Sequence, residues 1–190
     1  MTEAKPKVCP CCKSKFTPVR ALQKVCGPMC ALETTRQKKA KKAAAIEAAD
    51  RKATRVKLDA LRTQPQLKAL AQAAFNKFIR ARDSGKPCIS CGKPDTGAAN
   101  SRDAGHYRSR GSAPNLRFVE DNCHTQCKHC NKELSGNVVE YRKGLIERIG
   151  LHRVEQIEAD QTLRKYTKEG LIEIARYYNS EAKRLKKEIV

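Results

Sequence analysis

The chain has 190 residues, with 40 Lys and Arg against 20 Asp and Glu, and therefore a formal net charge of +20. Only 39% of the residues are hydrophobic and 5% are aromatic, which argues against one large apolar core and allows one ordinary domain or two small ones. Self-repulsion at this charge opposes compaction, and a polyanion would relieve it. Nucleic acid is therefore the leading class of partner, and an anionic membrane is the weaker alternative.

The sequence carries no sign of export or of a membrane span. No apolar run approaches the roughly 20 residues that cross a bilayer, and the opening MTEAKPK lacks the apolar stretch of a signal peptide. We therefore expect a cytoplasmic protein without a membrane partner, in a reducing compartment where thiols bind metal more often than they form disulfides. Ten cysteines in such a chain predict zinc.

The first cysteine group predicts a zinc knuckle over residues 1–34. Cys9 and Cys12 form one pair, and Cys26 and Cys30 form a second, with 13 residues between the pairs. Each short turn offers two thiolates to one tetrahedral ion, and a segment this small can hardly fold without metal or disulfides. Cys11 is expected to be a free thiol.

Residues 35–85 predict two helices. The run TTRQKKAKKAAAIEAADRKATRVKLDALRTQPQ is rich in strong helix formers and predicts a long exposed helix that ends before Pro65. A second helix is expected from about Gln66 to Asp83, with an apolar stripe that packs against the second cysteine group. That stripe consists of Leu67, Leu70, Ala71, Ala74, Phe75, Phe78 and Ile79. By direct count this segment holds +10 of the net charge, so we interpret it as a basic arm with a support helix.

Residues 86–150 predict a second module closed by cysteines. The pairs Cys88/Cys91 and Cys127/Cys130 enclose 35 residues and predict a structural zinc site without an open position for substrate. Two short strands are expected within the loop, over residues 103–108 and 116–119, with a short helix from about Cys127. Cys123 is expected to be a buried small apolar residue.

The rest of the chain predicts helices. One is expected to begin after Asn137 and to end at Gly150. Residues 151–190 form a helical tail whose last helix, from about Thr167, has apolar residues at heptad-like steps. Docking of that helix onto the domain is the expected use, and a homodimer interface is the alternative. The fold class expected from these elements is a small zinc-rich α+β protein.

Three polar residues stand at suggestive places in the second module. His106 lies on the first expected strand, Asn122 follows the second, and Asn131 directly follows Cys130. This His–Asn–Asn order, closed by two CxxC pairs, resembles the HNH or ββα-metal nuclease module. The segments CISCG, DAGHYRS, LRF, NCHTQC, SGN and YRKGLIERIG, together with the N-terminal cysteines and the basic helix, further resemble the NinG (Rap) recombination proteins of lambdoid bacteriophages.

The resemblance implies a metal-dependent endonuclease that acts on branched DNA, such as Holliday junctions and strand-invasion joints, in a bacterial host cell. It implies that His106 is the general base, that Asn122 holds the hairpin and orients the histidine, and that Asn131 ligates a catalytic Mg²⁺ or Mn²⁺. A histidine also suits base chemistry near neutral pH, and an amide oxygen suits a hard ion. The alternatives are a structural role for His106 and a helix cap for Asn131.

Asp103 is the candidate carboxylate ligand of the catalytic ion. The superfamily usually places an acid next to the histidine, but Gly105 occupies that position. In a regular strand, residues 103 and 106 point to opposite faces, so Asp103 is expected to reach the ion through a bulge at Ala104 and Gly105. The alternative is a strand-entry residue paired with Arg102 or Arg108.

Basic residues around the module are candidate DNA contacts. They are Arg108, Arg110, Arg117, Lys128 and Lys132, with His124 as a further phosphate or second-layer contact. The implied products are 5′-phosphate and 3′-hydroxyl ends. Two other functions fit the composition: a non-catalytic zinc-knuckle protein that binds nucleic acid, and an RNA- or ribosome-associated factor.

Overall fold

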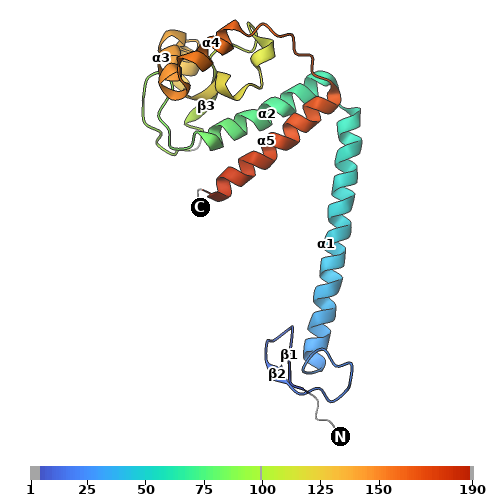
Figure 1. Ribbon diagram of the computed structural model, residues 1–190. Helices are drawn as coiled ribbons and strands as arrows, with labels where there is room; N and C mark the ends of the chain where they lie inside the picture. Colours follow the sequence, from blue (N-terminus) through green and yellow to red (C-terminus); the bar gives the residue numbers. More distant parts are fainter. Residues whose placement is uncertain (1–4, 99, 189–190) are drawn as a thin grey trace. The chain divides into compact units, whose positions relative to one another are not determined.

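The computed structural model describes residues 5–98 and 100–188 of the chain, and these fall into two units, with the boundary in the sequence between Leu61 and Arg62. The first unit begins with two antiparallel strands, β1 (Lys7–Val8) and β2 (Lys15–Phe16), and continues into helix α1 (Pro28–Leu61). Helix α1 is a single uninterrupted rod (Figure 1). The expected long helix is confirmed, and it begins within the first cysteine group, since Cys30 lies in its first turn.

The second unit is built on two helices, α2 (Gln64–Arg82) and α5 (Lys168–Glu188), which lie side by side (Figure 1). Thr63 caps α2 in a capping box with Gln66, and Pro65 occupies its first turn, where the missing N–H costs nothing. Helix α2 thus belongs with the second unit, while the basic helix α1 belongs with the first.

Aromatic side chains hold α2 and α5 together. The ring of Phe75 meets that of Tyr178 edge to face at 4.9 Å, and Phe78 lies 5.0 Å from the same tyrosine. The heptad-like face of α5 is therefore used for docking within the chain, as expected, because Leu171, Tyr178 and Ala182 are buried there. The expected α2 stripe is buried except for Leu70, which is 41% exposed.

A two-stranded hairpin, β3 (Arg102–His106) and β4 (Cys123–Cys127), packs on α2. A π-helical turn (His129–Glu133) and helices α3 (Val138–Ile149) and α4 (Leu151–Ala159) follow it. Tyr107, Leu116, Tyr141, Leu145 and Val154 form the second core, between the hairpin and these two helices. The expected mixed α+β class with two small sheets is confirmed.

The second expected strand was placed wrongly. Residues 116–119 were expected to form it, but Pro114–Leu116 and Glu120–Asn122 form 3-10 turns, and the strand begins only at Cys123. Asn122 therefore precedes the second strand. All five residues of β4 are buried, so its sequence shows none of the polar–apolar alternation that marks a half-exposed strand.

Among the described residues, no helix has the length and apolar character needed to cross a membrane.

A buried carboxylate joins α2, β4 and α3. Asp83 is 1% exposed and accepts hydrogen bonds from the Arg82 guanidinium at 2.9 Å and from the Thr125 N–H at 3.1 Å. Lys86, His124 and Arg148 lie within 3.3–3.8 Å of its oxygens. Burial alone would raise the pKa of Asp83, but His124 and Arg82 outweigh it and hold the pKa well below its ordinary range.

We expect Asp83→Asn to lower the free energy of unfolding by about 3–5 kcal/mol, because it leaves buried cations without their counter-charge. Urea unfolding of the zinc-loaded protein measures this. The exposed Glu173, on α5, supplies the control, and Glu173→Gln should shift stability by less than about 0.5 kcal/mol. Equal small effects of the two substitutions would show that the Asp83 cluster does not hold the three elements together.

Candidate active site

Both expected four-cysteine groups assemble. The sulfurs of Cys9, Cys12, Cys26 and Cys30 form one cluster and those of Cys88, Cys91, Cys127 and Cys130 form the other, each within 4.8 Å of one another. The Sγ atoms of Cys12 and Cys26 are 3.5 Å apart, and those of Cys91 and Cys127 are 3.8 Å apart. Four thiolates around a tetrahedral zinc ion lie about 3.8 Å apart, given Zn–S bonds of about 2.3 Å. Both clusters thus have the donor set and spacing to hold zinc.

Within the second cluster the backbone favours the thiolate of Cys88, while burial raises the pKa of Cys91 and Cys130. The N–H of Cys127 donates to Cys88 Sγ at 3.3 Å, and Asn137 Nδ2 lies 3.6 Å from Cys130 Sγ. Burial raises the pKa of Cys88, but backbone N–H groups, that of Cys127 first, outweigh it and lower the pKa to about 7. In the first cluster the backbone N–H of Cys12 is the main cause that lowers the pKa of Cys9 to about 6.

Two cysteines lie outside the clusters. Cys11 is half-buried and takes no part in the first group, so the expected free thiol is confirmed. Cys123 is 0% exposed and packs in the α2–α5 core, as expected of a small apolar residue. Burial raises the pKa of the Cys123 thiol and keeps it protonated at neutral pH.

An open cavity of about 360 Å³ brings Asp103, His106 and Asn131 together. Asp103 and His106 come from β3, and Asn131 comes from the π-helical turn after the second cysteine pair. Asn131 Nδ2 donates to Asp103 Oδ2 at 3.0 Å. The expected bulge is absent from β3, because every residue from Arg102 to His106 pairs with one residue of β4. Asp103 instead reaches the cavity through its contact with Asn131.

The His106 ring has a defined proton arrangement. Its Nε2 lies 2.9 Å from the carbonyl oxygen of Arg117, an acceptor only, so Nε2 carries the proton and Nδ1 holds the lone pair. Nδ1 lies 3.7 Å from the Cys123 sulfur, a weak partner. Burial, reinforced by the charges of Arg110 and Arg117, lowers the pKa of His106 to about 4. The imidazole is therefore neutral at pH 7 and able to accept a proton.

Asn122 ties together the loop between the strands. It is fully buried, and its side chain bonds to the backbone N–H and carbonyl of Arg108 and to the carbonyl of Leu116. Its own carbonyl accepts the N–H of Tyr107. Asn122 thus braces the chain that follows His106 and does not line the cavity. The ring of His106 is oriented instead by the carbonyl of Arg117.

Gly105 explains why no acid stands beside the histidine. A Cβ at this position would lie 2.0 Å from Gln126 Oε1, on the neighbouring strand of the hairpin, and 3.2 Å from Asn131 Oδ1. The first distance is too short for any side chain. Gln126 is 0% exposed and fixed by Ser90 and by the carbonyl of Gly136, so it cannot yield. The one carboxylate that lines the cavity among the described residues is that of Asp103.

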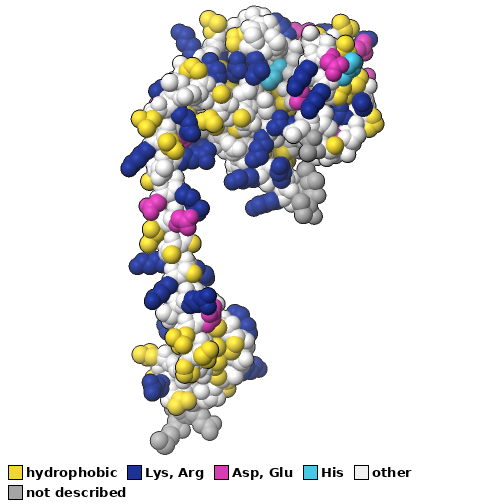
Figure 2. Space-filling view, turned by 180° about the vertical axis from the view of Figure 1, so that it is seen from behind, with side chains coloured by type: hydrophobic (Ala, Val, Ile, Leu, Met, Phe, Trp, Pro, Cys, Tyr) yellow, Lys and Arg dark blue, Asp and Glu magenta, His cyan; other side chains and the backbone are white. Residues whose placement is uncertain are grey.

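The expected basic residues fall in four different places. Arg110 and Lys132 line the His106 cavity. Arg117 lies next to it, with its guanidinium on the amide of Gln72, whereas Arg108 donates to the carbonyl of Glu158. Lys128 lines a different cavity. On the face shown in Figure 2, Lys and Arg side chains clearly outnumber acidic ones.

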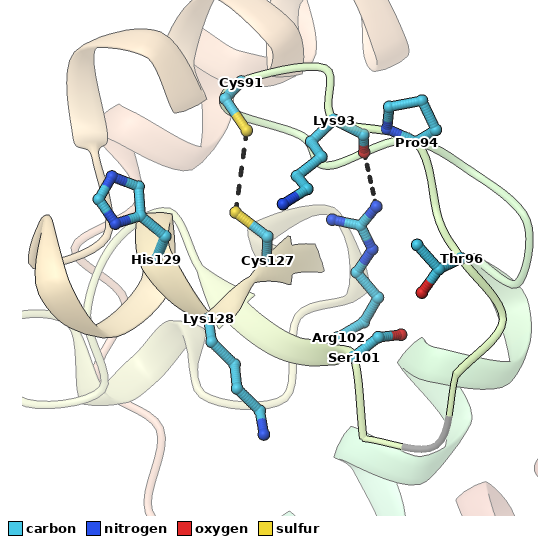
Figure 3. Close-up of a pocket in the computed structure, with 9 residues that line it drawn as sticks. All are labelled: Cys91, Lys93, Pro94, Thr96, Ser101, Arg102, Cys127, Lys128 and His129. Carbon is cyan, nitrogen blue, oxygen red and sulfur yellow. Dashed lines mark hydrogen bonds between the residues drawn. The ribbon is translucent and has the colours of Figure 1, made fainter.

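The cavity that Lys128 lines lies against the second cysteine cluster (Figure 3). It measures about 340 Å³ and is bordered by Cys91 and Cys127. Arg102 closes one side by donating to the carbonyl of Lys93, and its Nε lies 3.5 Å from Asp95. Arg102 therefore pairs with Asp95, and the alternative in which Asp103 would pair with Arg102 is not realised.

His124 was expected to be a phosphate contact or a second-layer residue of the site, but the structure buries it among residues that do not line the His106 cavity. Its side chain is buried, with Nδ1 2.9 Å from the Arg82 guanidinium and 3.5 Å from Asp83. The residue points away from solvent because β4 is covered on both faces. His129 and His152 are exposed and do not line the His106 cavity.

Two residues of α2 line the cavity although the sequence did not predict them there. Asn76 and Arg80 line it together with Asp103 and His106. Both lie on the α2 face opposite the apolar stripe, at an interval of four residues. That interval was visible in the sequence, but nothing in the sequence indicated that this face borders the hairpin.

Comparison with known proteins now places the chain. A family model described as "Bacteriophage Lambda NinG protein" matches residues 1–188. The chain belongs to the NinG family. Its relatives include the ninG proteins of Salmonella phage P22, 39% identical, and of Escherichia phage lambda, 38% identical; each match covers 92% of this chain and 90% of the relative. The ninG protein of Escherichia phage 933W is 47% identical over 61% of this chain and 56% of its own length. No solved structure matches the chain.

We expect the purified NinG-family chain to hold two zinc ions. Cys12→Ser and Cys130→Ser should each reduce the content to one, because each removes a thiolate from a different cluster. Cys11→Ser is the matched control and should retain two ions. Metal analysis after gel filtration gives the stoichiometry. Two ions in either cluster variant, or one in the control, would contradict the assignment of ligands.

Proposed function

We propose that the chain is a metal-dependent endonuclease that cleaves branched DNA recombination intermediates. The observation that carries the proposal is the single cavity that joins a neutral histidine, a carboxylate and an amide beside unpaired basic side chains. Phosphodiester hydrolysis needs a base for water, oxygen ligands for a cation and positive charge for the phosphate. The preference for Holliday junctions and strand-invasion joints rests on the resemblance to phage recombination endonucleases.

The cavity offers a donor set that fits Mg²⁺ or Mn²⁺. Asp103 supplies a carboxylate and Asn131 an amide oxygen, both half-buried at the cavity wall. Magnesium sites commonly use one or two carboxylates and complete their shell with water and substrate phosphate. An ion held there would stabilise the charge that develops on the phosphate and on the leaving oxygen.

The chain's own residues provide the proton transfer. His106 Nδ1 accepts a proton from water while Nε2–H stays bonded to the carbonyl of Arg117, so the ring cannot change tautomer without losing that bond. The activated water attacks phosphorus, and the bond to the 3′ oxygen breaks, which gives 5′-phosphate and 3′-hydroxyl ends. Arg80, Arg110 and Lys132 surround the reacting phosphate.

We expect His106→Ala to slow nicking of a four-way junction in Mg²⁺ by about 10²–10⁴-fold, the usual contribution of a general base. Binding of the junction should be unchanged, because the substitution removes no charge at neutral pH. His152→Ala, in an exposed histidine of α4, is the matched control and should cleave like the wild type.

Two outcomes separate the competing functions. A wild-type protein that binds junctions but never nicks them would support the non-catalytic zinc-knuckle alternative and overturn the nuclease. Cleavage by His106→Ala at the wild-type rate would leave the nuclease standing and show that another group activates the water.

A further inference from the structure

Helix α2 has a second face, which lines a row of three cavities. The central cavity is the one that holds His106. A cavity of about 500 Å³ lies toward the start of the helix and contains Lys68 and Arg117. A third, of about 410 Å³, lies toward its end and contains Lys77 and Lys186.

The three cavities are contiguous because they share side chains. Asn76 and Arg110 line both the first and the central cavity, and Arg80 lines both the central and the third. Most of the α2 residues that line the first and central cavities recur every three or four positions and so share one side of the helix, whereas Lys77 and Ala81, which line the third, lie further round it. The apolar stripe of α2, with Phe75 and Ile79, is buried on the other side. A continuous groove therefore follows α2 and passes through the candidate active site.

The groove is strongly basic. Its lining contains one acid, Asp103, and seven basic residues: Lys68, Lys77, Arg80, Arg110, Arg117, Lys132 and Lys186. None of these seven forms an ion pair with a carboxylate in the described part of the chain, although Arg142, Arg153 and Arg184 elsewhere in the same unit each do. The cavity beside α3 differs, since Glu140 and Glu147 offset its Lys143 and Arg148.

Like charges are also held close together in the groove. Arg117 is half-buried and bonds to the neutral amide of Gln72. Burial and the neighbouring charge of Arg110 lower the pKa of Arg117. Unpaired, partly buried cations of this kind cost stability, and a polyanion in the groove would offset the cost.

We propose that one DNA strand lies along this face of α2, with phosphates seated on both sides of the His106 cavity. Lys68 and Arg80 are 12 residues apart, which is about 18 Å of helix. Along the axis of duplex DNA the phosphates of one strand rise about 3.4 Å each, so this length corresponds to about five phosphates of one strand in a duplex arm. The proposal rests on the nuclease function proposed above and deepens it: α2 sets which phosphate reaches His106.

Salt dependence of DNA binding tests the groove. We use the full zinc-loaded chain in the His106→Ala background, so that the DNA stays intact, and a junction with labelled arms. Lys68→Gln and Lys77→Gln, at opposite ends of the groove and outside the catalytic cavity, should each lower the slope of log K against log salt by about 0.9. Each should also weaken binding roughly eightfold at 0.1 M salt. Lys143→Gln, on α3, removes the same charge elsewhere and should leave both unchanged.

Shortened substrates locate the two contacts. If the strand spans the cavity, trimming it on one side of the cleavage point should abolish the effect of Lys68→Gln and spare that of Lys77→Gln, and trimming on the other side should do the reverse. The proposal that the strand crosses the cavity would be overturned if both variants had the wild-type salt slope and affinity, or if only one of the two variants bound more weakly. Nicking by the protein with His106 intact is measured in parallel. If the protein nicks the junction but Lys68→Gln and Lys77→Gln bind it like the wild type, the groove is contradicted and the nuclease is not. If the protein does not nick the junction but both variants bind it more weakly, the nuclease is contradicted and the groove is not.

Discussion

The sulfur cluster of Cys88, Cys91, Cys127 and Cys130 is the constraint on which the second unit depends. It joins the loop after α2 to the end of β4 and so closes a segment of 35 residues that has few apolar side chains of its own. Asn131 enters the cavity because it directly follows the last ligand, in a π-helical turn that the cluster anchors. Gly144 of α3 packs closely on the turn between Cys88 and Cys91, because a Cβ on Gly144 would lie 2.0 Å from the carbonyl oxygen of Ile89 in that turn. An ion bound there would fix the hairpin, the turn and α3 at once.

The cysteine clusters and the helices could be predicted from the sequence because they depend on short spacings and on helical periodicity. That His106 and Asn131 line one cavity was implied by the family resemblance, since the two lie 25 positions apart in the chain. The second strand could not, since β4 is buried on both faces and lacks alternation. The burial of His124 depends on Asp83, 41 residues earlier in the chain, and nothing local indicates that contact. Asp103 was predicted as a ligand of the catalytic ion that a bulge would turn toward it; the residue lines the cavity, but from a regular strand and in contact with Asn131.

The excess charge takes two forms. Helix α1 carries many exposed basic residues on a rod with little apolar surface to bury, which suits contact with a polyanion that does not depend on sequence. In the described part of the second unit, the carboxylates that form ion pairs do so with basic residues outside the α2 groove, and the groove cations form none. Family membership fits both forms without specifying either, because it assigns no role to individual basic residues.

Asp103, Asn131 and His106 are proposed to form one metal-dependent site. Titration of the zinc-loaded protein with Mn²⁺, followed by NMR of the histidine rings, tests this most directly. The account predicts that the ring signals of His106 broaden at substoichiometric Mn²⁺ while those of the exposed His152 do not, and that Asp103→Asn abolishes the broadening. Equal broadening of both rings, or broadening of His106 that survives Asp103→Asn, would contradict the account.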